Sequence, residues 1–575
     1  MTLPSPQKEK AQWLDRYATA YHTWTLSTNK NGRTTFKRPL GLVETSFDTD
    51  GAYYGGRADM TGTLTCEVQH SLSKEDLRHR IASAWTALRL RHVLLMSRHY
   101  DDVSFDLRYF AVDVPQSLQQ AVRAVEESIV WVEDQYSHVD PHDLHDHALN
   151  VARIIEPKKC MSKLHVLPLE RLPGGTYKLS FLIIMAHQIS DGLSAYGWFK
   201  DLIRLLNLPL RAIEEEIKTS LNLDILRSKL PPAQEDLYPG IVGNKARQRW
   251  IWAIIRVLRH VKHTLPPTFT NPLYREKRRT KPEPLERTYN KLFSYKGPDM
   301  PPMNTGHMSA TLSPCASARL IALCKDARLS IGAGCFALAG LAMMDIHASR
   351  YPHLAPADVV PAMTASFPLN PRAFFANPPP ADSCMLAFSD GIVMPYLPAS
   401  LPIEKRFRLT SKIANRELRV YQKRLKTTGK GEISAGLDKH SPGRLLATGY
   451  LAQIERVESK LPEGRKLGFG NPQGELKAST GTAATCGVSS VGSLKGYFRP
   501  GEYDLNDKSK GFVADYRGLR MGVRARDGEF LIGSSTDSEG RVGFGVSYDA
   551  NAIDVEAAEM WARTITGLLE RESKL

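Results

Sequence analysis

The sequence predicts an α/β protein built from two halves, and three observations lead to that prediction. Strand-like runs alternate with amphipathic helical runs along the whole chain. At 575 residues, the chain is too long for a single hydrophobic core to be expected. A stretch rich in Pro, Lys and Arg separates two portions that each open with a strand followed by a helix. We therefore expect a first half over 1–209, a basic connecting segment over 210–303 and a second half over 304–575.

Periodicity places the elements of the first half. A helix is predicted over 74–90 because its apolar residues recur at steps of three and four, namely Leu77, Ile81, Trp85 and Leu88. Apolar runs bounded by turn residues predict strands over 61–68, 103–112, 163–169 and 177–185. The polar run at 141–147 is interpreted as a surface loop, and a second helix is expected over 193–206.

The connecting segment contains one predicted helix, over 246–263, that is both basic and amphipathic. At about 100° per residue, the apolar side chains fall on one face, namely Trp250, Ile251, Ile254, Leu258 and Val261. The opposite face carries Arg249, Arg256, His260 and His263. This pattern is typical of a helix that lies in a membrane interface. The alternative is a helix packed on its own protein with a solvated basic face.

The second half repeats the mixture of strands and helices. Helices are predicted over 315–327, 331–348, 403–425 and 556–570. Strands are predicted over 307–312, 359–366, 483–494, 521–526, 530–535 and 542–548. The helix over 331–348 consists of apolar and small residues, so we expect it to be buried. No short-period repeat is present.

Composition excludes several classes of protein. With 42% hydrophobic and 24% charged residues, the chain is neither disordered nor fibrous. The net charge of +15 would suit a nucleic acid, an anionic membrane surface or a phosphorylated co-substrate. No zinc-finger spacing, RNA-binding aromatic signature or strand–loop phosphate motif accompanies the charge. We therefore expect no nucleic-acid partner.

Cysteine usage and the N-terminus indicate an intracellular protein. The seven cysteines are odd in number and none are at C-x-x-C spacing, which predicts reduced thiols. The first ten residues, MTLPSPQKEK, contain no apolar run of the kind that a secretion signal needs. Apolar runs such as 181–186 and 335–344 are too short to span a bilayer. His142, His145 and His147 have metal-like spacing but no evident fourth ligand, so no metal site is expected.

The last three residues match a targeting signal. The chain stops at Ser573-Lys574-Leu575, and a C-terminal S-K-L is the address read by the peroxisomal import receptor. The alternative is simply a polar helix end. We expect a peroxisomal protein, and a cytoplasmic one if these three residues do not act as a signal.

The sharpest candidate site is the segment from His187 to Gly192. A hydrophobic strand ends there, His187 follows almost at once, and Asp191 and Gly192 precede a helix. A neutral imidazole at a strand end could accept a proton from a hydroxyl group. Asp191 is too close in sequence to act independently, so we expect it to hold an arginine and fix the loop. The alternative is a histidine at a strand end with Asp191 as an ordinary helix N-cap.

This H-x-x-x-D-G motif resembles that of the acyl-CoA-dependent acyltransferase superfamily. That superfamily includes chloramphenicol acetyltransferase, plant BAHD enzymes, peptide-synthetase condensation domains and fungal alcohol O-acetyltransferases. The segments 82–92, 315–344 and 489–492 are similar to its first helix, its paired helices and its small-residue strand. The plant DFGWG element is absent, and Ala186 stands where condensation domains have a second histidine.

The resemblance implies two chloramphenicol-acetyltransferase-like halves, made of mixed sheets with helices, that face each other across a central tunnel. His187 would deprotonate a hydroxyl acceptor as it attacks an acyl-CoA thioester, with no cofactor bound permanently. Ser490, with Ser489 as the neighbouring option and Gly492 beside them, would stabilise the oxyanion. Arg372 would pair with Asp191. CoA phosphates would favour a basic run, either 275–281 or 423–430.

The motif combined with S-K-L resembles the acyltransferases of fungal mannosylerythritol-lipid biosynthesis. This likeness implies that the enzyme acylates a hydroxyl of a glycolipid. Separately, we expect a monomer that can contact a membrane surface. Three alternatives stay open. They are acetylation of a terpenoid alcohol, condensation-domain-like amide formation, and an inactive module that binds lipid.

Overall fold

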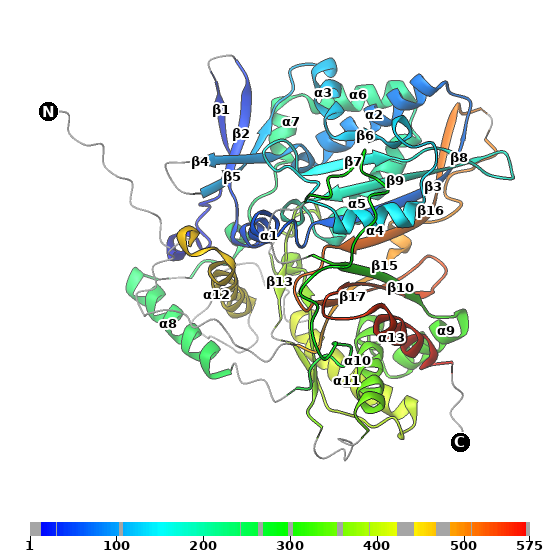
Figure 1. Ribbon diagram of the computed structural model, residues 1–575. Coiled ribbons are helices and arrows are strands. Elements are labelled where there is room, and N and C mark those ends of the chain that lie inside the picture. Colours follow the sequence, from blue (N-terminus) through cyan, green and yellow to red (C-terminus); the bar gives the residue numbers. More distant parts are fainter. Residues whose placement is uncertain are drawn as a thin grey trace.

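The computed structural model describes residues 13–570, with gaps at 30–31, 103–106, 242, 263–267, 297–302, 353–359, 376, 390, 423–441, 467–483 and 508. Two six-stranded sheets dominate the described chain, and smaller sheets of four and two strands accompany them. In Figure 1 the first large sheet and its helices form the upper part of the molecule, and the second large sheet and its helices form the lower part.

The first large sheet has the order β16-β3-β9-β7-β6, and β8 also pairs with β9. Its strands are β3 (Met60–His70), β6 (Ile129–Trp131), β7 (Ser162–Val166), β8 (Glu170–Arg171), β9 (Tyr177–Met185) and β16 (Phe512–Val523). β16 pairs with β3 along its whole length, from Phe512 opposite His70 to Val523 opposite Met60. The sheet of the first half therefore takes one strand from residues of the second half, and the strand expected at 521–526 begins earlier and belongs to this sheet.

Helices cover both faces of this sheet. Gly62 of β3 faces Phe199 of α5 (Gly192–Leu206), whereas the adjacent Thr63 binds His145 of α4 (Pro141–Asn150). Because successive strand residues point to opposite faces, the two helices lie on opposite sides of β3. Helix α2 (Lys74–Arg91) packs against α5. Helices α3 (Leu118–Glu126) and α6 (Leu210–Ser220) pack against α2, and α7 (Leu223–Ser228) packs against α6.

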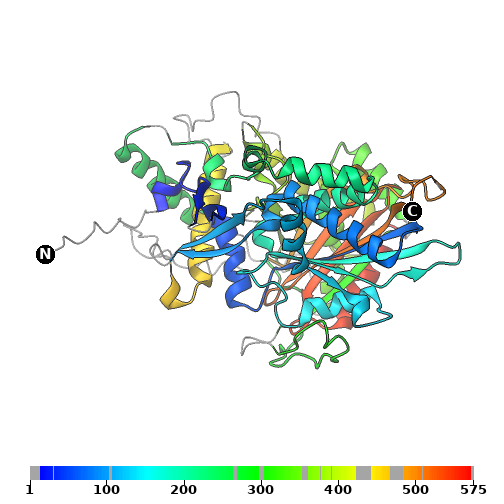
Figure 2. The ribbon, with the colours of Figure 1, turned by 90° about the horizontal axis from the view of Figure 1, so that it is seen from above.

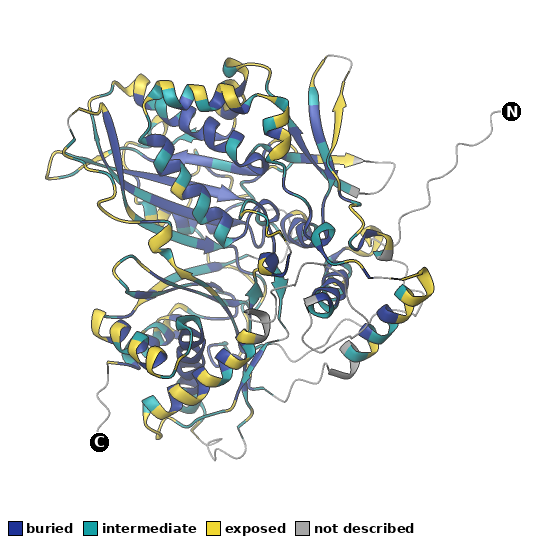
Figure 3. Cartoon of the chain, turned by 180° about the vertical axis from the view of Figure 1, so that it is seen from behind, coloured by how far each residue is buried: buried dark blue, intermediate teal, exposed yellow. Residues whose placement is uncertain are grey.

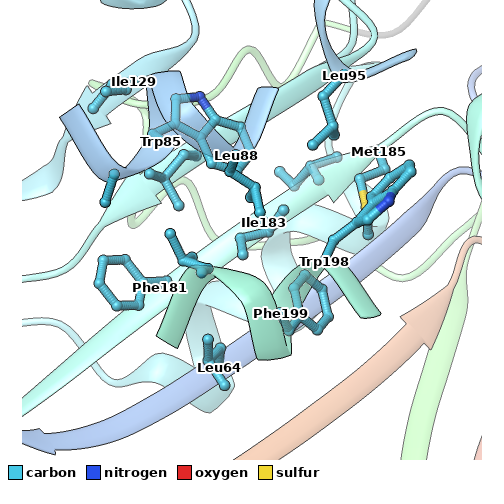
Figure 4. Close-up of a cluster of buried hydrophobic side chains, with 14 of the residues drawn as sticks. Leu64, Trp85, Leu88, Leu95, Ile129, Phe181, Ile183, Met185, Trp198 and Phe199 are labelled. Carbon is cyan, nitrogen blue, oxygen red and sulfur yellow. The ribbon is translucent and has the colours of Figure 1, made fainter. Parts of the chain in front are cut away.

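The core of the first part lies between β9 and helices α2 and α5. Figure 4 shows Trp85 and Leu88 of α2 beside Phe181 and Ile183 of β9, with Trp198 and Phe199 of α5 nearby. The indole of Trp85 is fully enclosed and donates a hydrogen bond to Ser128 Oγ at 3.0 Å. β9 is thus a rigid, buried support for whatever follows its C-terminal end.

The second large sheet is mixed and has the order β10-β18-β17-β15-β11-β14. Its strands are β10 (Thr305–Thr311), β11 (Met363–Ser366), β14 (Ile392–Met394), β15 (Cys486–Ser493), β17 (Phe530–Thr536) and β18 (Val542–Asp549). Its helices are α9 (Pro314–Asp326), α10 (Ile331–Arg350), α11 (Ile403–Gln422) and α13 (Val555–Gly567). α10 is long and apolar enough by composition to cross a membrane, but 78% of its apolar window is buried inside the protein. It is the core helix that its small apolar residues predict.

The connecting segment is not uniform. Its helices α6 and α7 place Ile213, Ile217 and Leu226 in the core of the first part. The expected basic helix is present as α8 (Lys245–Lys262), packed on α12 (Pro442–Lys460), which in turn contacts α1 (Leu42–Tyr53). α8 and α12 lie together at one side of the molecule in both Figure 1 and Figure 2.

The orientation of α8 differs from the predicted one. Ile251, Trp252 and Ile255 are buried, whereas Trp250, assigned to the apolar face, is 66% exposed. The helix has apolar residues around more than half its circumference, so the pattern alone cannot select the packed side. His263 of the predicted helix lies outside the described residues.

The polar run at 141–147 is the helix α4 rather than a loop. Asp140 caps its N-terminus by accepting a hydrogen bond from the His142 backbone, and Pro141 occupies the first turn. Both are favourable helix-start signals. His145 and His147 are buried and contact Thr63 and Tyr295 respectively, whereas His142 is exposed, so the three histidines do not converge on one point.

Two smaller sheets accompany the two large ones. The four-stranded sheet consists of β1 (Thr25–Thr28), β2 (Thr34–Pro39), β4 (Arg98–Asp102) and β5 (Leu107–Asp113). The two-stranded sheet consists of β12 (Pro368–Leu369) and β13 (Ala387–Phe388), which flank the segment that approaches the candidate site.

Candidate active site

His187 lies where the buried strand β9 ends. A single 3-10 turn, His187–Ile189, follows the strand, and α5 then begins at Gly192. Asp191 is the N-cap of α5, since its Oδ1 accepts hydrogen bonds from the backbone N–H of Ser194 at 2.9 Å and from Ser194 Oγ at 2.7 Å. The strand and the capped helix together fix the backbone on both sides of His187.

Asp191 also forms the ion pair that the sequence predicts. Arg372 Nη1 is 2.8 Å from Asp191 Oδ2, and both side chains are almost completely buried. Arg372 belongs to the 3-10 turn Pro371–Phe374 of the second half. The helix cap and the ion pair are therefore not alternatives, because one carboxylate serves both and joins the two halves of the chain.

A segment that no sequence motif indicated approaches from the second half. The Ser383 carbonyl accepts hydrogen bonds from Arg372 Nη2 at 2.7 Å and from Ser194 Oγ at 3.2 Å. The Met385 N–H donates to Asp191 Oδ2 at 3.2 Å. Between them, Cys384 places its sulfur 3.9 Å from His187 Nδ1. Backbone groups carry most of these contacts, so side-chain identity gives little signal of them in the sequence.

The same segment is anchored to the first half by His92. Its Nδ1 and Nε2 lie 2.6 Å from Asp382 Oδ1 and 2.9 Å from Asp201 Oδ2. Burial would lower the pKa of His92, but the hydrogen bonds to the two carboxylates outweigh burial and raise it. His92, hydrogen-bonded between the two aspartates, holds the 382–385 segment in place.

His187 is half-buried, and its surroundings keep its imidazole neutral. The ring of Phe47, from α1, stacks on it with centroids 3.9 Å apart and planes 7° apart. Burial lowers the pKa of His187 to about 4, and the positive charge of Arg526 acts in the same direction. Arg526 is held by Asp50, with Nη2 2.8 Å from Oδ2. An imidazole that is neutral at cellular pH can accept a proton.

His187 opens onto a cavity of about 660 Å³. Phe47, His187 and Gly192 line it from the first half, and strands of the second large sheet line it from the other side. Leu519, Met521 and Val523, alternate residues of β16, also line it. The cavity lies between the two parts of the molecule, so both halves supply its walls.

Glycines and hydroxyl side chains form the sheet face of this cavity. Strand register places Ser309 of β10, Gly545 of β18, Gly533 of β17 and Ser489 of β15 in one cross-strand row. A Cβ atom at Gly533 would lie 3.4 Å from the Gly545 carbonyl oxygen, and one at Gly545 would lie 4.0 Å from the Met521 carbonyl oxygen. The absence of side chains at these positions creates the space of the cavity.

The two candidate oxyanion serines lie on opposite faces of β15. Ser489 lines the cavity, together with Gly487 and Val491. Ser490, the preferred candidate from the sequence, is exposed, and its hydroxyl lies near Gly332 at the start of α10. Since strand residues alternate between faces, Ser489 rather than Ser490 faces the cavity that His187 also lines. Gly492 follows with φ of +79°, next to a register shift in β15.

Comparison with solved structures places this arrangement in a known fold. The trichothecene 15-O-acetyltransferase TRI3 of Fusarium sporotrichioides aligns over 96% of this chain and 97% of its own, with a TM-score of 0.63 and 12% identity. The condensation domain of the monacolin K polyketide synthase MokA aligns over 93% and 96%, with a TM-score of 0.50 and 10% identity. The chain has the condensation-domain fold of chloramphenicol-acetyltransferase type.

The likeness to these proteins is found by comparing structures and not by comparing sequences. SgcC5 of Streptomyces globisporus also aligns over 93% of this chain and 99% of its own, with a TM-score of 0.50 and 11% identity. No protein-family model and no curated protein matches the sequence. The predicted α/β fold of two facing halves is confirmed, whereas the tunnel through the condensation-type fold stays a prediction.

The remaining expected residues are placed as follows. In the basic run 275–281, Arg278 pairs with Asp527 and Asp549, so part of its charge is neutralised. The run 423–430 and the terminal residues 573–575 lie outside the described residues. No group of three or more His, Cys, Asp or Glu in the described chain could hold a metal ion. His145 Nδ1 is instead 2.8 Å from Thr63 Oγ1.

Proposed function

We propose that the chain is an acyl-CoA-dependent O-acyltransferase in which His187 is the general base. The observation that carries this proposal is the neutral, half-buried imidazole that lines a cavity formed by both halves. The likeness in fold to an acetyltransferase and to condensation domains supports acyl transfer as the class of reaction. The buried Asp191–Arg372 pair supports the position of the His187 loop.

The proposed reaction balances without a covalent enzyme intermediate. His187 takes the proton of the acceptor hydroxyl while its oxygen attacks the thioester carbonyl, which forms a tetrahedral oxyanion. Collapse of this intermediate breaks the C–S bond, and the imidazolium returns its proton to the departing CoA thiolate. A cavity that holds both reactants in line lowers the entropic cost of bringing them together. Ser489 is the proposed donor to the oxyanion.

We propose a glycolipid such as mannosylerythritol lipid as acceptor. Hydroxyl side chains line the cavity and suit a polyhydroxylated molecule: Ser309, Thr311, Ser366, Thr485, Ser489, Ser534, Ser535 and Ser547. The apolar residues of β16 on the cavity wall suit an acyl chain. Acyl-CoA is the proposed co-substrate, with no permanently bound cofactor.

Two other acceptors remain candidates because of specific structural likenesses. The similarity to a trichothecene O-acetyltransferase favours a terpenoid alcohol with a short acyl donor. The similarity to condensation domains favours an amine acceptor and a carrier-bound acyl group. His187 would be the base with either acceptor, so the two candidates are distinguished by the substrates that the enzyme accepts.

We also propose that the protein works as a monomer in the peroxisome. Ser573, Lys574 and Leu575 would be bound by the import receptor. A fluorescent fusion that keeps the native C-terminus is expected to colocalise with peroxisomes. Deletion of the three residues should leave it in the cytoplasm, and an unchanged peroxisomal signal would contradict the proposal.

The activity is tested by CoA release from short- to long-chain acyl-CoA esters. Each ester is offered with mannosylerythritol lipid, with a terpenoid alcohol, with an amine or with no acceptor. Acceptor-dependent release with the glycolipid, and the acylated product by mass spectrometry, is the expected result. Release only with the terpenoid alcohol or the amine would replace the glycolipid assignment. Silence with every acceptor would contradict the proposed function.

A further inference from the structure

Helix α8 has large apolar side chains on two sides, and those on only one side are buried against the rest of the protein. On the inner face, Ile251, Trp252 and Ile255 are buried. The ring of Trp252 packs edge-on against Trp13 and Tyr17, with centroids 5.1 Å and 4.9 Å away. These contacts attach α8 to the body of the molecule.

The outer face exposes large apolar side chains. Trp250 is 66% exposed and Val257 is 60% exposed, the two highest values among the large hydrophobic residues of the described chain. They are seven residues apart, so they point in nearly the same direction, two turns along the helix. In Figure 3, α8 is at the periphery with buried and exposed residues on its two sides.

The charged residues of α8 itself have one sign. The sequence of α8, KARQRWIWAIIRVLRHVK, contains no Asp or Glu. Lys245, Arg247 and Arg249 are exposed beside Trp250. A tryptophan and a valine among exposed basic residues match the region where lipid headgroups meet acyl chains.

We propose that the outer side of α8, defined by Arg247, Arg249, Trp250 and Val257, binds the surface of an anionic lipid membrane. The basic residues are attracted to anionic headgroups, each strengthening binding about fivefold. Trp250 and Val257 insert between the headgroups. These exposed apolar side chains favour a membrane over RNA, because binding to RNA by charge alone would not require them. Membrane binding is independent of the proposed acyltransferase activity, because it involves no substrate.

The proposal is tested with the full-length protein and sedimented vesicles. Vesicles of phosphatidylcholine alone are compared with vesicles that also contain phosphatidylserine. The wild type is expected to bind the anionic vesicles more tightly. Trp250→Ser combined with Val257→Ser should weaken binding at least about tenfold, and Arg247→Glu combined with Arg249→Glu should abolish the preference for phosphatidylserine.

A matched control uses an exposed apolar residue elsewhere. Val555 is 55% exposed at the start of α13, and Val555→Ser should bind vesicles as the wild type does. The α8 variants should keep the thermal stability of the wild type, because the altered side chains are exposed. Wild-type protein that stays in solution with anionic vesicles would overturn the proposal. Unchanged binding in both double variants, or binding to RNA without binding to vesicles, would also overturn it.

Discussion

Replacing Arg372 by Ala removes the cation that lies against Asp191. The two groups are 2.8 Å apart, and their side chains are only 6% and 4% exposed. Removing one partner of a buried ion pair costs about 3–5 kcal/mol, because the other charge is left buried without compensation. The same guanidinium binds the carbonyl of Ser383, next to Cys384 at His187. We therefore expect Arg372→Ala to lower both thermal stability and turnover.

The size of the effect follows from the burial of the pair. For a domain of 150–250 residues, each kcal/mol lowers Tm by about 2–4 °C, so a fall of about 6–20 °C is expected. Arg563 offers a matched control, since its pair with Glu559 is 3.3 Å long but 68% and 57% exposed. Such exposed pairs contribute at most about 1 kcal/mol, and Arg563→Ala should leave turnover unchanged.

The assay is a thermal melt combined with acceptor-dependent CoA release, extended to a double-mutant cycle with Asp191→Asn. If the pair is coupled, the double variant should lose less stability than the two single variants together. Arg372→Ala with wild-type melting and full turnover would refute the reasoning. Strictly additive losses would show that Arg372 and Asp191 act separately.

Three further predictions concern the cavity. The neutral form of His187 is the active one and its pKa is about 4, so kcat/KM should fall only when the pH drops through about 4. Phe47→Ala admits water to the imidazole and should move this acid limb of the pH profile toward pH 6.5. Gly545→Val fills the floor of the cavity, so the longest accepted acyl-CoA should become shorter in a chain-length series. Ser489→Ala should lower kcat by about 10²–10³ if its hydroxyl binds the oxyanion.

Controls for these variants come from the same elements. Gly174 lies in the β8–β9 turn with no atom near an added Cβ, so Gly174→Val should not alter chain-length preference. Ser490→Ala, on the outer face of β15, should turn over as the wild type does. An acid limb near pH 6.5 in the wild type, an unchanged chain-length series in Gly545→Val, or equal losses for the two serines would contradict the respective prediction.

Local pattern was sufficient to locate the centre of the candidate site. The buried strand before His187 and the helix after Gly192 are continuous in sequence, so their geometry could be inferred from periodicity and capping. The pairing of Asp191 with Arg372 needed the resemblance to a known motif, because 181 residues separate the two. The observed ion pair confirms that long-range expectation.

Other features depend on tertiary contacts that periodicity does not report. Phe47 reaches His187 from α1, and Cys384 reaches it from a segment held by backbone hydrogen bonds. β16 joins the first sheet although it follows most of the second in sequence. Each of these contacts is set by packing between distant segments, and none has a local motif.

The preference for Ser490 over Ser489 shows a different limit. A strand exposes alternate residues on opposite faces, so an error of one position transfers a residue from the cavity to the outer surface. Adjacent serines give no sequence signal that would decide between them. The polarity of the run at 141–147 predicts a loop, although Asp140 and Pro141 are favourable signals for the start of a helix.

The most direct test of the account is acceptor-dependent CoA release by the wild type and by His187→Ala under identical conditions. General-base catalysis contributes about 10²–10⁴ to a rate. We therefore predict that the variant binds acyl-CoA and keeps the thermal stability of the wild type, while acceptor-dependent release falls by that factor. A His187→Ala enzyme that retains the wild-type rate would contradict the central claim that this imidazole is the base.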